Sequence, residues 1–332
     1  MRALVTGGAG FIGRYIVEQL LARGDEVVSF SRSAHPELVE IGAQTYQGDI
    51  QDRETLIAAC AGVDVVFHLM GMWGEWGDWE PYYNINVAGT ENVIAACRAQ
   101  GVPKLVFTST PSVVRDSRPQ EGADESLPYP DRYESHYARS KALAEQAVLA
   151  ANGSGLLTVS LRPHLVIGPG EEKIIPGLLN RAGDGQVPQI GDGTNLIDIT
   201  YVEDAARAHL LAADALAPGS PAAGSAYFIS QDEPVNAWKW INELFVALGF
   251  PPSRRKVPLW LALAACTGIE TAYRVLPLKG DPPLTRFLAY ALGLSHYYDI
   301  SRAKADLGYK PQIDMAEVNR RIVAHFRKEM GR

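Results

Sequence analysis

The stretch that determines the fold is "RALVTGGAGFIGRYIVEQLLARGDEVVSF", Arg2 to Phe30. A short apolar segment leads into three glycines, Gly7, Gly10 and Gly13. Apolar residues then recur at helical spacing until Gly24, and a second apolar segment follows. This order predicts a strand, a glycine turn, a helix and a second strand.

Each glycine of the turn meets a separate physical need. Gly7 permits the tight turn, Gly10 lets the backbone approach a pyrophosphate, and Gly13 lets the helix pack on the sheet. The first turn of the helix, with Phe11 and Ile12, then offers free N–H groups to the phosphates. The stretch therefore predicts a dinucleotide-binding unit.

The alternation of strands and helices continues along the first half of the chain. Strand patterns occupy 63–71, 103–110 and 156–163, and helix patterns occupy 84–101 and 140–153. Such alternation is typical of an α/β protein with a doubly wound parallel sheet, the Rossmann fold.

Beyond Gly168 the alternation weakens and apolar helices dominate. We expect a Rossmann domain over 1–167 and 191–232, and a smaller, mostly helical substrate-binding domain over 168–190 and 233–332. Five apolar residues of the second domain could form either its core or the wall of a pocket, and we favour the core. These residues are Leu259, Trp260, Leu263, Leu284 and Phe287.

Composition excludes several classes of protein. Of 332 residues 47% are hydrophobic and 21% charged, and the net charge of −7 argues against a nucleic-acid partner. The three cysteines are too far apart for a disulfide framework, and no metal-ligand spacing is present. We expect a cytoplasmic homodimer without a metal.

The longest apolar run, Val257 to Cys266, has ten residues, against about 20 for a membrane span. A basic cluster, Ser253 to Lys256, precedes it. The favoured reading is a helix that caps an apolar pocket, and peripheral contact with a membrane is the alternative.

The end of the second strand indicates the cofactor. NAD-binding folds usually carry an acidic residue there for the ribose 2′-hydroxyl, and this chain has Ser31, Arg32 and Ser33 instead. A guanidinium and two hydroxyls suit a 2′-phosphate, so we expect NADP(H), with NAD(H) as the alternative. Asp49 and Ile50 follow the third strand and are expected beside the adenine.

"YARSK" places Tyr137 and Lys141 four residues apart, on one face of a helix. A phenol has an ordinary pKa of about 10, and a neighbouring ammonium favours its ionised form. Tyr137 could then exchange a proton with a substrate oxygen, while Lys141 also holds the nicotinamide ribose. The alternative is an exposed helix pair without function.

Seven segments together resemble the extended short-chain dehydrogenases/reductases: "TGGAGFIG", "FHLMG", "NVAGT", "FTST", "YARSK", "LRPHLVIGPG" and "YVEDAARAH", in order from Thr6 to His209. The resemblance implies that Thr110 binds the reacting oxygen and that Asn86 is architectural. It also implies a set of cofactor contacts, Leu69, Met70, Gly71, Pro163 and Leu165, and two substrate contacts, Pro111 and His164.

Neighbouring residues separate the branches of this family. Dehydratases carry an acidic pair where this chain has Pro111-Ser112, and sugar-nucleotide epimerases continue "VYG" where it has Val113-Val114-Arg115. "TSTPSVV" and the segment from Pro282 to Pro311 resemble the 3β-hydroxysteroid dehydrogenase branch, which includes sterol carboxylate dehydrogenases and bacterial reductases of long-chain 2-alkyl-3-keto acids.

The resemblance implies an NADP(H)-dependent oxidoreductase that interconverts a ketone and a secondary alcohol on a bulky apolar substrate. A β-keto acid is the preferred substrate and a 3β-hydroxysteroid the second. A sugar-nucleotide epimerase and a catalytically silent NADPH sensor are the alternatives, although a sensor has no need of Tyr137 and Lys141.

"GMWGEWGDWEPYY", Gly71 to Tyr83, holds three of the six tryptophans, Trp73, Trp76 and Trp79. It follows a strand of the parallel sheet, at the edge where such sheets bind ligands. We expect Trp73 and Trp76 to line the apolar substrate pocket. The alternative is a small core formed by the segment on itself.

Overall fold

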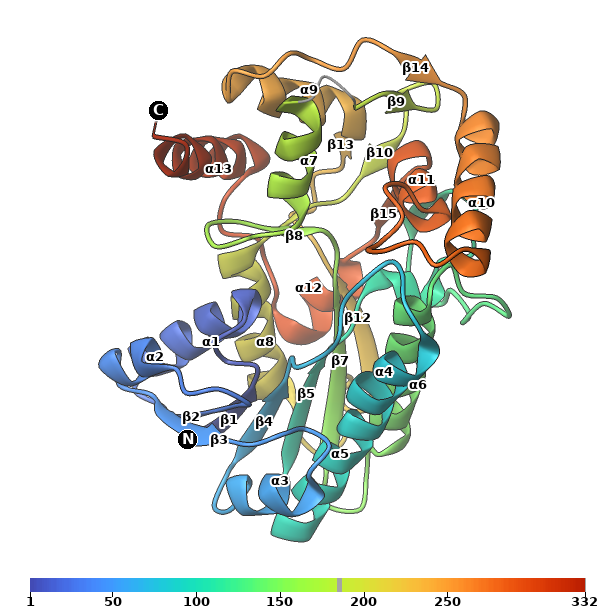
Figure 1. Cartoon of the computed structure of the whole chain (residues 1–332). Helices are drawn as coiled ribbons and strands as arrows, with labels where there is room; N and C mark the ends of the chain where they lie inside the picture. Colours follow the sequence, from blue (N-terminus) through green and yellow to red (C-terminus); the bar gives the residue numbers. More distant parts are fainter. Residues whose placement is uncertain (184–186, 332) are drawn as a thin grey trace.

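A computed structural model describes residues 1–183 and 187–331 (Figure 1). Its centre is a parallel sheet in the order β12-β7-β5-β4-β1-β2-β3. The strands are β1 (Arg2–Thr6), β2 (Glu26–Ser31), β3 (Gln44–Gln47), β4 (Val65–His68), β5 (Lys104–Thr108), β7 (Leu157–Pro163) and β12 (Ser225–Ile229). The expected Rossmann fold is confirmed.

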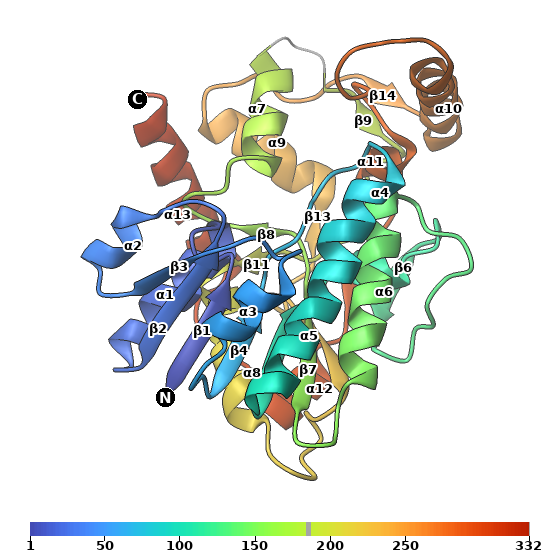
Figure 2. The same cartoon turned by 60° about the horizontal axis from the view of Figure 1, so that its bottom comes forward.

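Helices cover both faces of this sheet (Figure 2). One face carries α1 (Phe11–Ala22) and α8 (Val202–Ala215), and the other carries α3 (Arg53–Ala59), α5 (Gly89–Gln100) and α6 (His136–Ala150). A short helix, α2 (Pro36–Glu40), follows β2. Adjacent strand residues enter opposite cores: Val5 packs with Ile16 on the first face, and Leu4 packs with Val93 on the second. Burial on both faces explains why these strands are apolar without alternation.

The second domain lies beyond the carboxyl edge of the sheet (Figure 1). Its helices are α7 (Ile174–Gly183), α9 (Ala237–Ala247), α10 (Leu259–Val275), α11 (Arg286–Gly293) and α13 (Met315–Glu329). Trp238, Phe245 and Phe326 belong to its core.

Short strands join the helices of the second domain. A four-stranded sheet has the order β13-β10-β15-β6, formed by β13 (Val235–Asn236), β10 (Leu196–Ile197), β15 (His296–Tyr298) and β6 (Gln120–Ala123). Two further pairs are β8 (Val166–Ile167) with β11 (Thr200–Tyr201), and β9 (Gln189–Ile190) with β14 (Lys256–Val257).

One part of the expected second domain, near the C-terminus, contacts the central sheet. Helix α12 (Ser301–Leu307) packs on α8 and β12, and Ile300 and Tyr309 join the core of the first domain. This part of 233–332 therefore supports the Rossmann sheet, because its apolar side chains cover the otherwise open edge strand β12. Of the segments expected to form the second domain, 184–186 and 332 lie outside the described residues.

The expectation that Trp260 is buried in the second domain is wrong, because its side chain is 71% exposed. The other four residues of that set are partly buried. Leu259, Leu263 and Leu284 pack against the core of the second domain, and Phe287 lies under the Arg115 guanidinium.

Candidate active site

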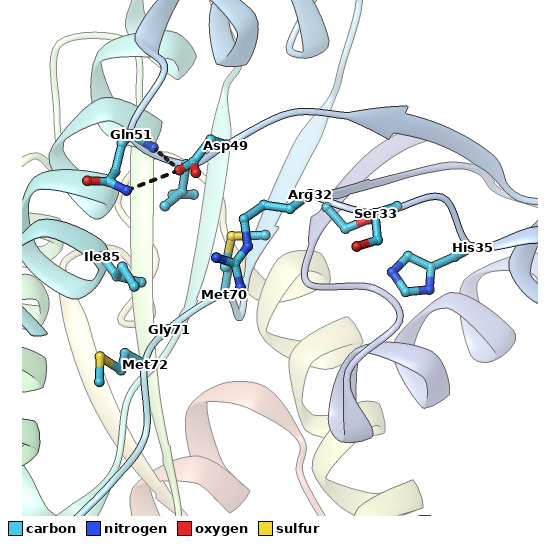
Figure 3. Close-up of a pocket in the computed structure, with 11 residues that line it drawn as sticks. Arg32, Ser33, His35, Asp49, Gln51, Met70, Gly71, Met72 and Ile85 are labelled. Atoms are coloured by element: carbon cyan, nitrogen blue, oxygen red, sulfur yellow. Dashed lines mark hydrogen bonds between the residues drawn. The ribbon is translucent and has the colours of Figure 1, made fainter. Parts of the chain in front are cut away.

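A cavity of about 310 Å³ opens between the loops that follow β2, β3 and β4 (Figure 3). Seven residues expected at the cofactor line it: Ser31, Arg32, Ser33, Asp49, Ile50, Met70 and Gly71. The structure adds four that the sequence did not indicate: His35, Gln51, Met72 and Ile85.

The polar groups of this cavity are held by local hydrogen bonds. Ser31 Oγ donates to the Ser33 carbonyl (2.8 Å), and Gln47 Nε2 donates to the Arg32 carbonyl (2.8 Å). Asp49 Oδ1 accepts from the Gln51 backbone N–H (2.9 Å; Figure 3). With these bonds made, the exposed Arg32 guanidinium remains available to an anion at the end of β2.

The glycine turn after β1 has no room for side chains. Gly7 has a φ of +76°, and its carbonyl accepts from Gly10 N over 2.9 Å. A Cβ on Gly13 would lie 2.1 Å from the same carbonyl oxygen, closer than atoms approach one another. The turn therefore places bare backbone at the start of α1, which fits a dinucleotide pyrophosphate.

A second cavity, of about 890 Å³, begins at this turn. Gly7, Gly10, Phe11, Ile12 and Gly13 line it, and Leu69, Gly71, Trp73, Thr108 and Val166 are among its other lining residues. Two other expected cofactor contacts lie next to this region in the chain. Pro163 is buried at the end of β7, and Leu165 has a φ of +42° just before β8.

The buried His68 of β4 positions the residues that follow this strand. Its Nε2 lies 2.9 Å from Thr90 Oγ1, which itself donates to the Asn86 carbonyl, so Nε2 carries the proton. Its Nδ1 then accepts from Thr6 Oγ1 (2.7 Å), and Thr6 Oγ1 accepts from Met70 N. Burial lowers the pKa of His68 to about 3, so the neutral ring fixes Met70 at the wall of the first cavity.

The candidate catalytic residues meet at the N-terminal half of α6. Ser135 caps this helix by accepting from Ala138 N (3.1 Å). Lys141 Nζ donates to the Thr108 carbonyl (2.6 Å) and lies 4.0 Å from the centre of the Phe107 ring. Burial lowers the pKa of Lys141 to about 7, and Glu145 opposes this shift.

Tyr137 lies one turn before Lys141 on the same helix. Burial raises the pKa of its phenol to about 12, and a hydrogen bond with Thr110 opposes that shift. Thr110 caps the 3₁₀ turn η2 (Pro111–Val114) by accepting from Ser112 N (3.3 Å). The structure thus brings together the three residues expected to be catalytic.

A buried ion pair that the sequence did not indicate joins α6 to β7. Arg162 Nη2 of β7 donates to Glu145 Oε1 over 2.7 Å. The Glu145 carboxylate also accepts from Ser160 Oγ and Tyr129 OH, each over 2.8 Å. These bonds fix the face of α6 that carries Lys141, because Glu145 lies one turn further along it.

Each tryptophan of the 71–83 segment packs on a different element. The Trp73 ring is 44% exposed, and Lys173 Nζ lies 4.8 Å from its centre. Trp76 stands edge-on to Tyr273 of α10 with ring centres 6.4 Å apart. Trp79, which begins α4 (Trp79–Tyr82), lies 5.6 Å from the His136 ring. The rings therefore contact the second cavity, α10 and α6, and the segment also packs on itself, since the Trp79 and Tyr83 ring centres lie 5.8 Å apart and Tyr82 OH donates to the Trp76 carbonyl.

The two remaining candidates for substrate contact are buried. Pro111 begins η2. His296 Nε2 donates to the Ala291 carbonyl (2.7 Å), so its Nδ1 accepts from His164 Nε2 (3.1 Å). His164 is thus engaged with β15, a contact that the sequence did not predict.

A Rossmann sheet with a Tyr–Lys pair on a helix at its carboxyl edge is the arrangement of the NAD(P)-dependent short-chain dehydrogenases/reductases. The chain belongs to the 3-beta hydroxysteroid dehydrogenase/isomerase family, which it matches over residues 4–259. It is therefore an NAD(P)-dependent dehydrogenase or reductase that acts on a keto or hydroxy group.

Three similar proteins extend this result. A 2-alkyl-3-oxoalkanoate reductase of Stenotrophomonas maltophilia is 46% identical, over 98% of this chain and 99% of the relative. The decarboxylating sterol-4-alpha-carboxylate 3-dehydrogenase of Homo sapiens is 34% identical, over 98% of this chain and 88% of the relative. The solved structure of MoeE5 in complex with UDP-glucose and NAD is 26% identical, with a TM-score of 0.76, and covers 99% of this chain and 100% of its own.

Proposed function

We propose that this protein is an NADP(H)-dependent reductase that interconverts a 2-alkyl-3-oxoalkanoate and the corresponding 3-hydroxy acid. A 3β-hydroxysteroid is the second candidate substrate. The observation that carries the proposal is the cluster in which Tyr137 is hydrogen-bonded to Thr110 one helical turn from the buried Lys141.

The nicotinamide, when bound, supplies or accepts the hydride at the carbon that bears the oxygen. In the reductive direction Tyr137 donates a proton to that oxygen, and its raised pKa keeps the phenol protonated at neutral pH. Thr110 hydrogen-bonds the same oxygen, and Lys141 holds the ribose hydroxyls next to the sheet edge. Lys141 is buried and Tyr137 and Thr110 are partly buried, and burial strengthens their electrostatic interactions.

Preference for NADP(H) rests on the end of β2. Arg32 offers a guanidinium where NAD-binding folds usually place an acidic side chain. Arginine pairs with phosphate through two parallel hydrogen bonds, so it favours the cofactor that carries the 2′-phosphate.

Two observations support an apolar keto acid. The relative with 46% identity over nearly its whole length is a 2-alkyl-3-oxoalkanoate reductase. Trp73 lines the second cavity, and Trp76, in the same segment, packs on Tyr273 of α10, so both supply apolar surface there. The sugar-nucleotide alternative is favoured by MoeE5, which binds UDP-glucose, but that likeness is at only 26% identity.

The deciding experiment compares three substrate classes with the full chain. Free β-keto acids lose CO₂ spontaneously, so the stable 2-alkyl-3-hydroxyalkanoate is oxidised with NADP⁺, alongside a 3β-hydroxysteroid and a UDP-sugar. Formation of reduced nicotinamide is followed by absorbance. We expect the largest kcat/KM for the hydroxy acid. Turnover of the steroid alone would select the second candidate, and turnover of the UDP-sugar alone would overturn both.

A further inference from the structure

Helix α10 lies at the periphery of the second domain in both views, beyond α11 (Figures 1 and 2). Its buried residues, Ala262, Cys266 and Glu270, recur every four positions and so mark one narrow face. The Glu270 carboxylate accepts from the Arg286 backbone N–H (2.7 Å) and from its Nε (2.8 Å). These contacts fix the inner face of α10 against α11.

The outer face of α10 is apolar and open. Trp260 is 71% exposed, Leu261 45% and Val275 75%. Smaller uncharged residues fill the face between them, namely Ala264, Ala265, Thr267, Gly268 and Thr271. The two threonine hydroxyls donate to carbonyls of their own helix, over 2.8 Å and 2.7 Å, so they add little polarity to the face. A continuous exposed apolar surface of this kind marks an interaction site.

Basic residues stand at both ends of this face. Arg254, Arg255 and Lys256 precede α10, and Arg274 and Lys279 lie at and beyond its last turn, all exposed. Residues 251–280 hold these five basic residues and one acidic residue, the buried Glu270, whereas the whole chain has a net charge of −7. The local charge is therefore opposite to that of the molecule.

We infer that the outer face of α10 lies on a lipid bilayer that contains anionic headgroups. Interfacial helices combine an apolar face with flanking Lys and Arg, and Trp is enriched at the level of the headgroups. No helix within 1–183 and 187–331 is long and apolar enough to cross a membrane, so the contact is peripheral. Trp260, Leu261 and Val275 enter the headgroup region, and the exposed Arg254, Arg255, Lys256 and Lys279 face the anionic lipids.

The same charges disfavour a second copy of the chain as the occupant. In an antiparallel pair related by a two-fold axis, Arg254 to Lys256 of one copy would meet Arg274 and Lys279 of the other. In a parallel pair each basic cluster would meet itself. Like charges across an interface oppose association, whereas an anionic lipid surface neutralises the basic residues that flank this face.

The other side of α10 connects this surface to the candidate active site. Tyr273 packs edge-on against Trp76, and the Arg274 guanidinium lies 5.3 Å from the centre of the Trp76 ring. A helix that rests on a bilayer would thus place the 71–83 segment close to any substrate dissolved in the lipid. The membrane contact itself does not depend on the identity of that substrate.

The test is co-sedimentation of the full chain with vesicles of phosphatidylcholine alone or mixed with phosphatidylglycerol. We expect binding that is stronger to the anionic vesicles and weakened by salt, which shortens the screening length. In the triple variant R254Q/R255Q/K256Q the partition coefficient should fall roughly a hundredfold, since each basic residue contributes about fivefold. W260E/L261E should lower it by about tenfold or more.

The matched control is Val246→Glu, at a valine of α9 that is 60% exposed and lies outside this face. Circular dichroism and a melting curve verify each variant, and Trp260→Ser replaces the double variant if that one does not fold. Equal binding by wild type and the α10 variants overturns the proposal, as does an equal loss in Val246→Glu. A dimer that depends on Trp260, without vesicle binding, would assign the face to a second copy instead.

Discussion

Asn86 Nδ2 donates a hydrogen bond to Ser140 Oγ over 2.8 Å, and this bond joins the tryptophan segment to α6. Asn86 lies in the π-helical turn η1 (Tyr83–Ala88), and it also binds Met72 through both backbone groups, N–H (2.6 Å) and carbonyl (2.9 Å). Ser140 Oγ in turn donates to the Tyr137 carbonyl (2.9 Å). The buried Asn86 amide therefore fixes Met72, which lines the first cavity, relative to Tyr137, the candidate proton donor.

Replacing Asn86 with Ala should impair both folding and turnover. The backbone groups of Met72 and the Ser140 hydroxyl would lose partners, at about 1–3 kcal/mol for each buried group left unsatisfied. Melting curves and kcat/KM measure the two effects. Asn84→Ala, at a partly buried position of the same turn, is the control and should be close to wild type. Normal kinetics in Asn86→Ala would show that this amide does not position Tyr137.

Tyr137→Phe removes the phenolic hydroxyl while the ring remains. We expect kcat to fall at least about a hundredfold, because general acid catalysis typically contributes about 10²–10⁴-fold. The dissociation constant of NADPH, measured by fluorescence, should change little. Near-normal turnover would exclude Tyr137 from the proton transfer.

Arg32→Ala tests whether Arg32 makes the enzyme prefer NADP(H) over NAD(H). The variant should weaken NADPH binding far more than NADH binding, since only NADPH presents a 2′-phosphate to the guanidinium. Arg14→Ala is the control, because Arg14 lines the pyrophosphate end of the second cavity and pairs with Glu18. Equal losses for both cofactors in Arg32→Ala would show that Arg32 does not bind the phosphate.

The pKa of Lys141 predicts a change of stability with pH. Burial lowers it to about 7 from 10.5, so between these pH values the unfolded chain binds more protons than the folded one. The free energy of unfolding that this residue contributes therefore rises with pH across that window and is lost as pH falls through about 7. Without cofactor, the melting temperature of wild type relative to Lys141→Met should increase from pH 7 to pH 10. A constant difference would contradict the lowered pKa.

The sequence was most informative where a local pattern has one structural solution. The Gly7–Gly13 turn and the alternation of strands and helices specified the sheet, because few topologies satisfy both. The boundary of the second domain was less predictable. Helix α12 returns to the first domain through contacts with α8, which depend on chain positions nearly a hundred residues apart and leave no local pattern.

In the candidate site, too, local spacing was predictable and contacts between distant elements were not. Tyr137 and Lys141 lie on one helix, so their spacing alone indicated that they meet. The Glu145–Arg162 ion pair and the contact of His68 with Thr6 each join two elements, and each single residue resembles an ordinary helix or strand position. Trp260 was misplaced because an apolar residue at helical spacing usually faces a core, whereas here the uncharged face of α10 points outward.

The tryptophan segment provides the last prediction. If Trp73 and Trp76 line the substrate pocket, replacing either with Ala should raise KM for long-chain substrates and change it much less for a truncated ketone. Each buried CH₂ of substrate contributes roughly 0.8 kcal/mol, so the loss should grow with chain length. Trp79→Ala is the control, because that ring packs on His136 and Arg139 instead.

Melting curves for the same variants separate a pocket wall from a packing role. A wall residue as exposed as Trp73, at 44%, should cost little stability when it is removed. A tryptophan that served mainly as core would cost about 3–5 kcal/mol, and the kinetic loss would then be the same for every chain length. A large drop in melting temperature with a loss independent of chain length would therefore refute the pocket-wall role. A loss that increases with each added CH₂, at an unchanged melting temperature, would identify these two rings as contacts of the alkyl chain.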